Sequence, residues 1–423
     1  MAIALLDIND SNLQLWHGDQ QLQSPGYALL DGKQYRFGSG ARAAARLSPR
    51  QINTRFWWQL DTQALQPALG PARHTADLVH AHLLDIYQAG GKPEEILLSV
   101  SGSIDRDQLA LVLGIIGQCP FNAVGLVNRS VALGSLYGGP GKLFHLEIQL
   151  HQAVISELAE SGGKVELKRT IPLPGCGLLQ LQERLVEIIA TAFIRQTRFD
   201  PRRKADTEQM LYDALPTTLR ELQTVSETNL EVNGYRARIA GAELETAGSR
   251  LFSSAPDAMG VLSPSDRVIL DPLATLLPGL HSHIPQAHVI ANDAMPTALN
   301  QHMDQLVQRN ETLNFITALP CLTEKITPSD IDQQLIIETP APPLPAPTHW
   351  LQGATARPLQ ASGTTLEHGL ELFAEGGIWC LRPGSDTPPQ VNGAAYRDGT
   401  ALRPGDSLTS STGITTVLIE IQP

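Results

Sequence analysis

Short apolar runs alternate with longer amphipathic segments along the first part of the chain. Ile3 to Asp7, Glu95 to Val100 and Ala123 to Val127 have the length and composition of buried strands. Between them, apolar residues recur at helical spacing over Thr75 to Ala89 and Gln108 to Gly117. Because alternating strands and helices form parallel pairs with right-handed crossovers, this pattern predicts an α/β fold.

The hydrophobic pattern after Gly141 predicts a second set of elements. Leu143 to Ile155 alternates apolar and polar residues without a glycine, which predicts one continuous strand that runs on toward a second strand at Lys164 to Arg169. Helical spacing predicts long helices over Leu178 to Gln196 and Asp206 to Leu222. Asn233-Gly234 is a strong signal for a β-hairpin.

The character of the chain changes at Thr339. Five prolines lie within Thr339–Thr348, which is typical of a semi-rigid linker. Beyond it, short strands and the turns Asn392-Gly393 and Pro404-Gly405-Asp406 predict a small all-β, sandwich-like domain. We therefore expect three parts, comprising residues 1–338, the linker 339–348 and the β domain 349–423.

Composition narrows the range of partners and sites. The chain has 423 residues and a net charge of −12, which argues against a nucleic-acid backbone as partner. The start of the chain has no basic region of a signal peptide, and no apolar run approaches membrane-spanning length, so we expect a cytoplasmic protein without membrane insertion. The four cysteines form no CxxC pair, and we expect no metal. His74, His80 and His82 cannot share one helix face, so we expect them at the surface.

The segment that follows the strand at Ala123 to Val127 resembles a known motif. It reads NRSVALGSLYG and matches, without a gap, the N-E-P-T-A-A-A-L-A-Y-G segment of DnaK-type (seventy-kilodalton heat-shock) chaperones at Asn128, Ala132, Leu136, Tyr137 and Gly138. The resemblance implies the two-lobed actin-like ATPase (ribonuclease H-like) fold. In that family the glutamate of the segment helps to organise Mg²⁺, and Arg129 stands at its position here.

Other ligand-contacting segments of the family have counterparts in this chain. Its first hairpin, I-D-L-G-T-T-N-S, is matched here by LDINDSNL, with Asp7 and Asn12 at matching places, Asn9 for the glycine and Asp10 for a threonine. The family's catalytic lysine falls at Gln59, whose neutral amide cannot supply a point charge to a phosphoryl group.

Two further segments depart from the family pattern. The second phosphate loop of the family falls on residues 145–151, which include Glu147 and contain no glycine. Its third loop falls on Asp271-Pro272, where the proline removes a backbone donor. The candidate nucleotide-binding remnants are therefore Asp7, Asn9, Asp10, Asn12, Gln59, Arg129, Glu147 and Asp271, and the resemblance implies neither catalytic residues nor a cofactor.

The C-terminal part resembles a second family. Gln390–Gly393 and Leu402–Leu408 are similar to the second half of forkhead-associated domains, although the Gly-Arg pair and Ser-x-x-His turn that bind phosphothreonine there have no counterpart. The sequence thus favours a degenerate DnaK-like protein that acts as a protein–protein interaction scaffold or regulatory chaperone-like factor without ATP turnover. The alternatives are a nucleotide-dependent chaperone with substituted site residues and a phosphopeptide-binding adaptor that acts through the β domain.

Overall fold

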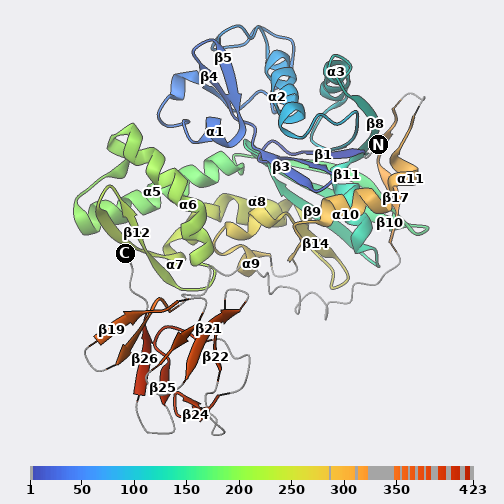
Figure 1. Cartoon of the computed structure of the whole chain (residues 1–423). Helices are drawn as coiled ribbons and strands as arrows, with labels where there is room; N and C mark the ends of the chain where they lie inside the picture. The colour runs from blue at the N-terminus through green and yellow to red at the C-terminus, as the bar shows by residue number, and fades with distance from the viewer. Residues whose placement is uncertain are drawn as a thin grey trace. The chain divides into compact units, whose positions relative to one another are not determined.

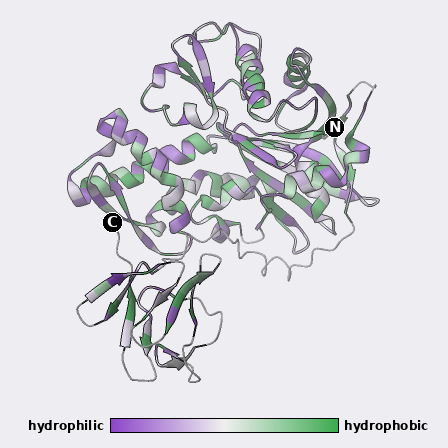
Figure 2. Cartoon of the chain, in the orientation of Figure 1, coloured by the Kyte–Doolittle hydropathy of each residue, from purple (hydrophilic) through white to green (hydrophobic). Residues whose placement is uncertain are grey.

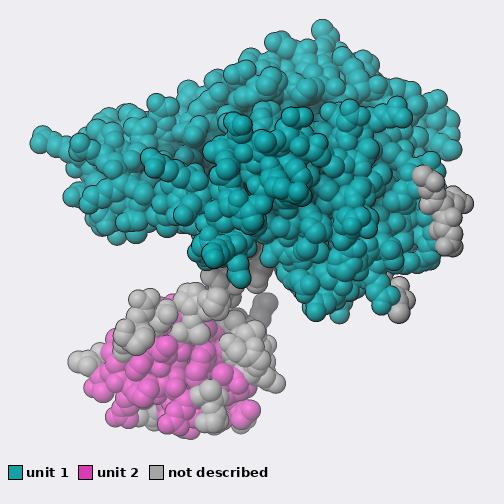
Figure 3. Space-filling view, turned by 90° about the horizontal axis from the view of Figure 1, so that it is seen from above, with its two compact units in different colours: residues 1–325 teal, residues 326–423 magenta. Residues whose placement is uncertain are grey.

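The computed structural model describes two compact units, Met1–Lys325 and Ile326–Pro423, which are coloured separately in Figure 3. The described residues are 3–284, 287–309, 313–322, 347–352, 355–360, 363–366, 370–375, 378–382, 389–396, 402–409 and 415–419. Most of the segment predicted to be a linker, 339–346, lies outside these residues. Each unit is therefore described by itself.

The first unit contains two six-stranded sheets, one in each of two lobes. We define the first lobe as residues 3–141 together with residues 315–316, and the second lobe as residues 142–309 together with residues 318–320. The sheet of the first lobe has the order β16-β8-β7-β1-β2-β3. Its strands are β1 (Ala4–Ile8), β2 (Leu13–His17), β3 (Gln20–Ser24), β7 (Glu95–Val100), β8 (Asn122–Asn128) and β16 (Phe315–Ile316). Strands β1, β7, β8 and β16 run parallel, whereas β1, β2 and β3 form an antiparallel meander.

The sheet of the second lobe repeats this arrangement with the order β15-β14-β9-β10-β11-β17. Its strands are β9 (Lys142–Ile148), β10 (Gln152–Ser161), β11 (Lys164–Pro174), β14 (Arg267–Leu270), β15 (Ala287–Val289) and β17 (Ala318–Pro320). Again an antiparallel meander, β9-β10-β11, is extended by parallel strands, here β14 and β15. The prediction of an α/β fold with parallel pairing is confirmed.

Helices and smaller sheets complete the unit (Figure 1). The α-helices are α1 (Gly38–Arg42), α2 (Thr75–Ala89), α3 (Arg106–Ile116), α4 (Arg129–Gly134), α5 (Leu178–Thr197), α6 (Ala205–Glu221), α7 (Gly241–Leu244), α8 (Ser249–Met259), α9 (Leu280–His283), α10 (Ala294–Gln301) and α11 (Met303–Leu306). The 3-10 turns are η1 (Pro49–Gln51), η2 (Ser135–Tyr137), η3 (Pro201–Arg203), η4 (Glu245–Gly248) and η5 (Pro272–Leu276). The small sheets are β4 (Ala28–Asp31) with β5 (Gln34–Phe37) and β6 (Ile52–Asn53), and β12 (Glu227–Val232) with β13 (Tyr235–Ala240).

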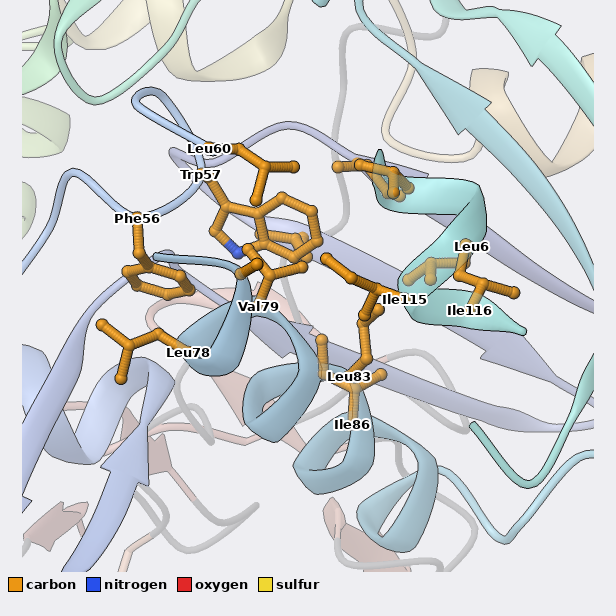
Figure 4. Packing of buried hydrophobic residues seen from close by; sticks show 14 of the residues in the cluster. Leu6, Phe56, Trp57, Leu60, Leu78, Val79, Leu83, Ile86, Ile115 and Ile116 are labelled. Carbon is orange, nitrogen blue, oxygen red and sulfur yellow. The ribbon is translucent and has the colours of Figure 1, made fainter. Parts of the chain in front are cut away.

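Apolar packing fixes these elements within and between the lobes. Helix α2 carries hydrophobic and hydrophilic residues side by side, and its Leu78, Val79 and Leu83 lie in the cluster that contains Phe56 and Leu6 (Figures 2 and 4). A second cluster joins the lobes, because α4 and α10 contribute side chains that pack with strands of both sheets. Burying large aliphatic side chains contributes roughly 1.5–3 kcal/mol each, so this shared core resists separation of the lobes.

Two sequence predictions are wrong in the first unit. The chain does not continue as one strand over residues 143–155, because β9 ends at Ile148 and a tight turn leads into β10 at Gln152. The glycine that permits this turn is Gly177, where a Cβ atom would lie 2.3 Å from the carbonyl carbon of His151. His82 is fully buried rather than at the surface, since its ring accepts a hydrogen bond from Trp57 Nε1 at 3.0 Å.

The second unit is a small β structure with two sheets of order β19-β18-β26-β25-β23-β24 and β20-β21-β22. Its strands are β18 (His349–Gln352), β19 (Thr355–Pro358), β20 (Thr364–Thr365), β21 (Glu371–Glu375), β22 (Ile378–Arg382), β23 (Gln390–Val391), β24 (Ala394–Ala395), β25 (Ser407–Thr409) and β26 (Thr415–Ile419). Trp350 and Leu418 from one sheet share a hydrophobic cluster with Leu372 and Leu381 from the other. Asn392-Gly393 forms the predicted turn with positive φ angles of 52° and 81°.

Across the described part of the chain, none of the helices is long and apolar enough to cross a membrane.

Candidate functional site

The two lobes meet where the turns and strand ends of both sheets face each other. Seven of the eight residues predicted from the sequence lie at this junction, namely Asp7, Asn9, Asp10, Asn12, Arg129, Glu147 and Asp271. The eighth, Gln59, is exposed and lines a different cavity beside α3. Residues that are far apart in the sequence are thus brought together by the pairing of β1, β8, β9 and β14 within their sheets.

Arg129 is the centre of the junction. It is the first residue of α4, and the side chain of Asn128 caps this helix by accepting a hydrogen bond from the Val131 amide at 3.0 Å. Strand β8 ends inside the molecule, and Arg129, which follows it, is therefore buried between the lobes. The strand-to-helix connection therefore places a permanent positive charge at the interface.

The guanidinium of Arg129 binds three buried carboxylates. Its Nε donates to both carboxylate oxygens of Asp7 at 3.0 Å. Its Nη1 and Nη2 form a bidentate pair with Asp271 at 2.9 and 3.0 Å, and Nη1 also contacts Glu147 at 3.2 Å. Asp7 belongs to the first lobe, whereas the other two acids belong to the second. One side chain consequently ties the lobes together, and we call Arg129, Asp7, Glu147 and Asp271 the arginine cluster.

Hydroxyl and imidazole groups orient the carboxylates of the arginine cluster. Ser99 Oγ donates to Asp7 at 2.9 Å, and His145 Nε2 lies 3.4 Å from Asp271. Ser130 Oγ lies 2.9 Å from His145 Nδ1. With a proton on Nε2, the His145 ring donates to Asp271 and accepts from Ser130. The arginine cluster therefore holds one cation and three carboxyl groups, whose orientation these contacts fix.

The charges of the arginine cluster shift one another's pKa values. Burial by itself raises the pKa of Asp271, but Arg129 and His145 more than compensate and hold it well below its usual range. Burial, only partly offset by Arg129, leaves the pKa of Asp7 raised. Burial would lower the pKa of Arg129, but its three acidic partners raise it well above the usual value. The guanidinium accordingly stays charged at every pH at which the protein is folded.

The hairpin turns of the two lobes contact each other directly. Asp10 in the β1–β2 turn accepts a hydrogen bond from the Leu150 amide at 2.8 Å, and Asn9 Nδ2 lies 3.4 Å from the Ile148 carbonyl. Burial, with a smaller contribution from Glu147, raises the pKa of Asp10 to about 7. The two turns therefore occupy the space between the lobes with their own side chains.

Gln149 and His151 fasten the second turn to the first lobe. Gln149 Nε2 donates to Ser101 Oγ and to Ser103 Oγ, both at 2.9 Å. The ring of His151 stacks on Trp58 with centroids 5.0 Å apart, and burial lowers its pKa. These contacts are not predicted from the sequence, although polar residues at the tip of an apolar hairpin need hydrogen-bond partners elsewhere once they are buried.

A further contact joins the lobes away from the arginine cluster. The backbone amide of Arg46, which follows α1, donates to Gln209 Oε1 on α6 at 2.9 Å. Its guanidinium lies 4.0 Å above the ring centre of Tyr212 and 3.8 Å from a carboxylate oxygen of Glu208. In addition to the shared apolar cluster, polar contacts thus link the lobes at the arginine cluster with its adjoining turns and at the Arg46 contact.

A cavity of about 610 Å³ remains between these contacts. Its floor includes Asp7, Arg129 and Asp271, and Arg42 and Arg220 lie on its walls. Leucines of the second lobe form an apolar side, namely Leu178, Leu181, Leu185, Leu215, Leu219, Leu273, Leu276 and Leu277. Three arginines and two aspartates therefore line this cavity, and the guanidinium of Arg129 is already bound to both aspartates.

The donor set at the junction does not form a metal site. Within the described residues, no group of three or more His, Cys, Asp or Glu side chains is arranged to hold a metal ion. The carboxylates of the arginine cluster point at a guanidinium, which occupies the space that a divalent cation would need. The residues present therefore do not fit the Mg²⁺ that the family resemblance would suggest.

No model of a known protein family matches this sequence, and no curated protein is similar to it. The geometry of the interlobe junction is consequently the basis on which its function is inferred.

Proposed function

We propose that this chain is a catalytically degenerate DnaK-like protein that works as a protein–protein interaction scaffold without ATP turnover. The repeated strand order of the two lobes supports the actin-like fold that the sequence resemblance implies. The observation that carries the proposal is the arginine cluster, in which Arg129 joins the carboxylates of both lobes.

The arginine cluster supports this function in two ways. A guanidinium that makes hydrogen bonds to three acids supplies the positive charge that a bound metal would otherwise provide. In addition, the contact joins the lobes without a ligand, and a nucleotide could change their closure only through a difference in affinity between two states. A surface of fixed shape is the property that a scaffold needs.

The turn contacts support the same conclusion. In a phosphate-binding loop, glycines let backbone N–H groups approach the phosphate. Here Asp10 receives the Leu150 amide of the opposite turn, so that this donor is already occupied by a carboxylate. The polypeptide itself makes the contacts across the junction, and we propose that the lobes keep a single closure.

Calorimetry of the full chain with ATP or ADP and Mg²⁺ tests the nucleotide part of the proposal. We expect no saturable heat and no phosphate release above that of buffer. An Arg46→Ala variant is the matched control, because it removes an interlobe arginine outside the arginine cluster and should also bind no nucleotide. A micromolar dissociation constant for the natural chain would refute the proposal.

Affinity capture from native lysate, followed by mass spectrometry, tests the scaffold part. The captured proteins should be the same with and without Mg²⁺-ATP, because no nucleotide alters the bait. Release of the captured proteins by ATP, when the same ATP leaves an unrelated bait unaffected, would instead favour the nucleotide-dependent chaperone.

A further inference from the structure

A basic and aromatic surface lies at the end of α5, away from the interlobe cavity. It consists of the last turn of α5, the following segment and strand β13, and we call it the α5–β13 surface. Its residues are Ile194, Arg195, Arg198, Phe199, Arg202, Arg203, Lys204 and, at the start of β13, Tyr235. The run Arg202-Arg203-Lys204 is the densest basic stretch of this part of an otherwise acidic chain.

Aromatic stacking and side-chain hydrogen bonds hold the α5–β13 surface together. Phe199 and Tyr235 stack with ring centroids 4.3 Å apart and an angle of 7° between their planes. Gln196 Nε2 donates a hydrogen bond to the Arg238 carbonyl at 2.8 Å, and the Arg238 amide donates to Gln196 Oε1 at 2.9 Å. The aromatic pair therefore lies beside Arg198 at the end of α5, whereas Arg236 and Arg238 lie on the opposite face of β13 from Tyr235, which shares its face with the buried Ala237.

Apolar and cationic groups are exposed together on the α5–β13 surface. Ile194 and Tyr235 are 41% and 44% exposed, although large apolar side chains are usually buried. Arg198, Arg203 and Lys204 are exposed and make no ion pair within the described part of the chain. The surface thus combines exposed apolar side chains with positive charges that no carboxylate in the described part of the chain neutralises.

The net charge of the surface has the opposite sign to that of the chain. Five Arg and Lys side chains lie beside three acids, Asp200, Asp206 and Glu243, which leaves an excess of two positive charges. The whole chain carries −12, so the remainder carries −14. A positive patch on a negative protein attracts an acidic partner to this place and repels it elsewhere.

We infer that the α5–β13 surface binds an acidic segment of a partner protein that carries an aromatic or aliphatic anchor residue. The anchor packs against Ile194 and the Phe199–Tyr235 pair, and carboxylates of the partner pair with Arg198 and Arg203. Carboxylates fit because arginines of this surface already bind carboxylates of their own chain, as Arg195 binds Glu243 at 3.1 Å. A nucleic acid is disfavoured because the excess charge is small and the rest of the protein repels a polyanion.

The inference names a partner class for the proposed scaffold and rests on that function. Its site, however, lies outside the arginine cluster and the cavity. Nucleotide calorimetry on the same protein sample distinguishes the two proposals. Nucleotide binding would overturn the proposed scaffold function without bearing on the α5–β13 surface. Failure of the peptide to bind would overturn the surface without bearing on nucleotide.

Fluorescence anisotropy of the full chain with a fluorescein-labelled peptide of Glu-Glu-Phe repeats tests the inference. We expect saturable binding that weakens with salt, and no binding of the same peptide with glutamine in place of glutamate. The double variant Arg198→Glu/Arg203→Glu should bind about tenfold more weakly. The control Arg50→Glu/Arg106→Glu, with the same charge change on the first lobe, should bind within about twofold of the natural chain.

Two further variants guard against a folding artefact. Arg198→Gly removes the charge at a position of positive φ that glycine tolerates. It should weaken binding of the peptide without lowering the stability of the protein. Tyr235→Ala should also weaken binding of the peptide, because it removes the apolar contact with the anchor residue. Equal affinity of the natural chain and both charge-reversal variants would overturn the inference. The inference would also be overturned if a single-stranded oligonucleotide displaced the labelled peptide at a lower concentration than the unlabelled peptide does.

Discussion

Arg129→Ala is the substitution that tests the structure most severely. It removes the only cation of the arginine cluster and leaves Asp7, Glu147 and Asp271 buried beside one another. Breaking a buried ion pair by removing one partner typically costs about 3–5 kcal/mol, because the remaining charge is uncompensated. Against a total stability of about 5–15 kcal/mol, the variant should remain folded at 15–25 °C with a much reduced free energy of unfolding.

The pH dependence of this loss identifies its cause. In the natural chain the pKa of Asp271 is held below its unfolded value of 3.8, so its stabilising effect is present above about pH 4 and is lost as the pH falls through the folded pKa. Without Arg129, burial raises the folded pKa values of Asp7 and Asp271 above their unfolded values, because no cation remains to offset it. The variant is therefore stabilised as the pH falls, and the difference between the two proteins should be largest near pH 7 and shrink toward pH 4.

Urea unfolding followed by tryptophan fluorescence at several pH values measures both effects. Arg46→Ala, the control outside the arginine cluster, should cost about 1 kcal/mol or less, since its ionic partners are partly exposed. Millimolar guanidinium chloride should raise the melting temperature of Arg129→Ala, whereas equal sodium chloride should not, because the ion binds only the folded state. A loss below about 1 kcal/mol, or one that does not change between pH 4 and 7, would refute this account of the arginine cluster.

Four other outcomes can be measured. Arg198→Gly should raise the free energy of unfolding by roughly 1 kcal/mol in thermal or urea unfolding, because arginine there has a φ of 62°; a decrease would contradict this. Asp10→Asn should stabilise the chain increasingly as the pH rises from about 4 to 7, because the raised pKa of Asp10 makes the natural chain lose stability over this range; an increment that does not depend on pH would refute it. Small-angle scattering should give the same radius of gyration with and without Mg²⁺-ATP, and a change would show that nucleotide alters lobe closure. Residues 349–423 expressed alone should give a dispersed amide spectrum and a cooperative melt, and a disordered fragment would contradict independent folding.

Local patterns of the sequence determined much of the secondary structure. The predicted helix at Thr75 to Ala89 and strand at Glu95 to Val100 are confirmed with the same bounds, because burial of one helix face or of a whole strand leaves a periodic signature. The helix predicted near Gln108 to Gly117 is α3, and Asp105 caps it by accepting hydrogen bonds of 2.9 and 2.8 Å from the first turn. Asn233-Gly234 forms its hairpin because both residues adopt positive φ angles.

Tertiary structure alone decided how the interlobe junction is built. The sequence singles out Arg129 and the three acids, yet it cannot show that they bind one another, since Arg129 lies 122 residues from Asp7 and 142 from Asp271. Their contact depends on the register of β8, β9 and β14, which many distant residues set together. The turn at residues 149–151 has the same origin, because Gly177, distant from it in the sequence, is the residue that makes room for it. Side-chain periodicity records which face of an element is buried, whereas the partner that buries it is chosen by the packing of the whole chain.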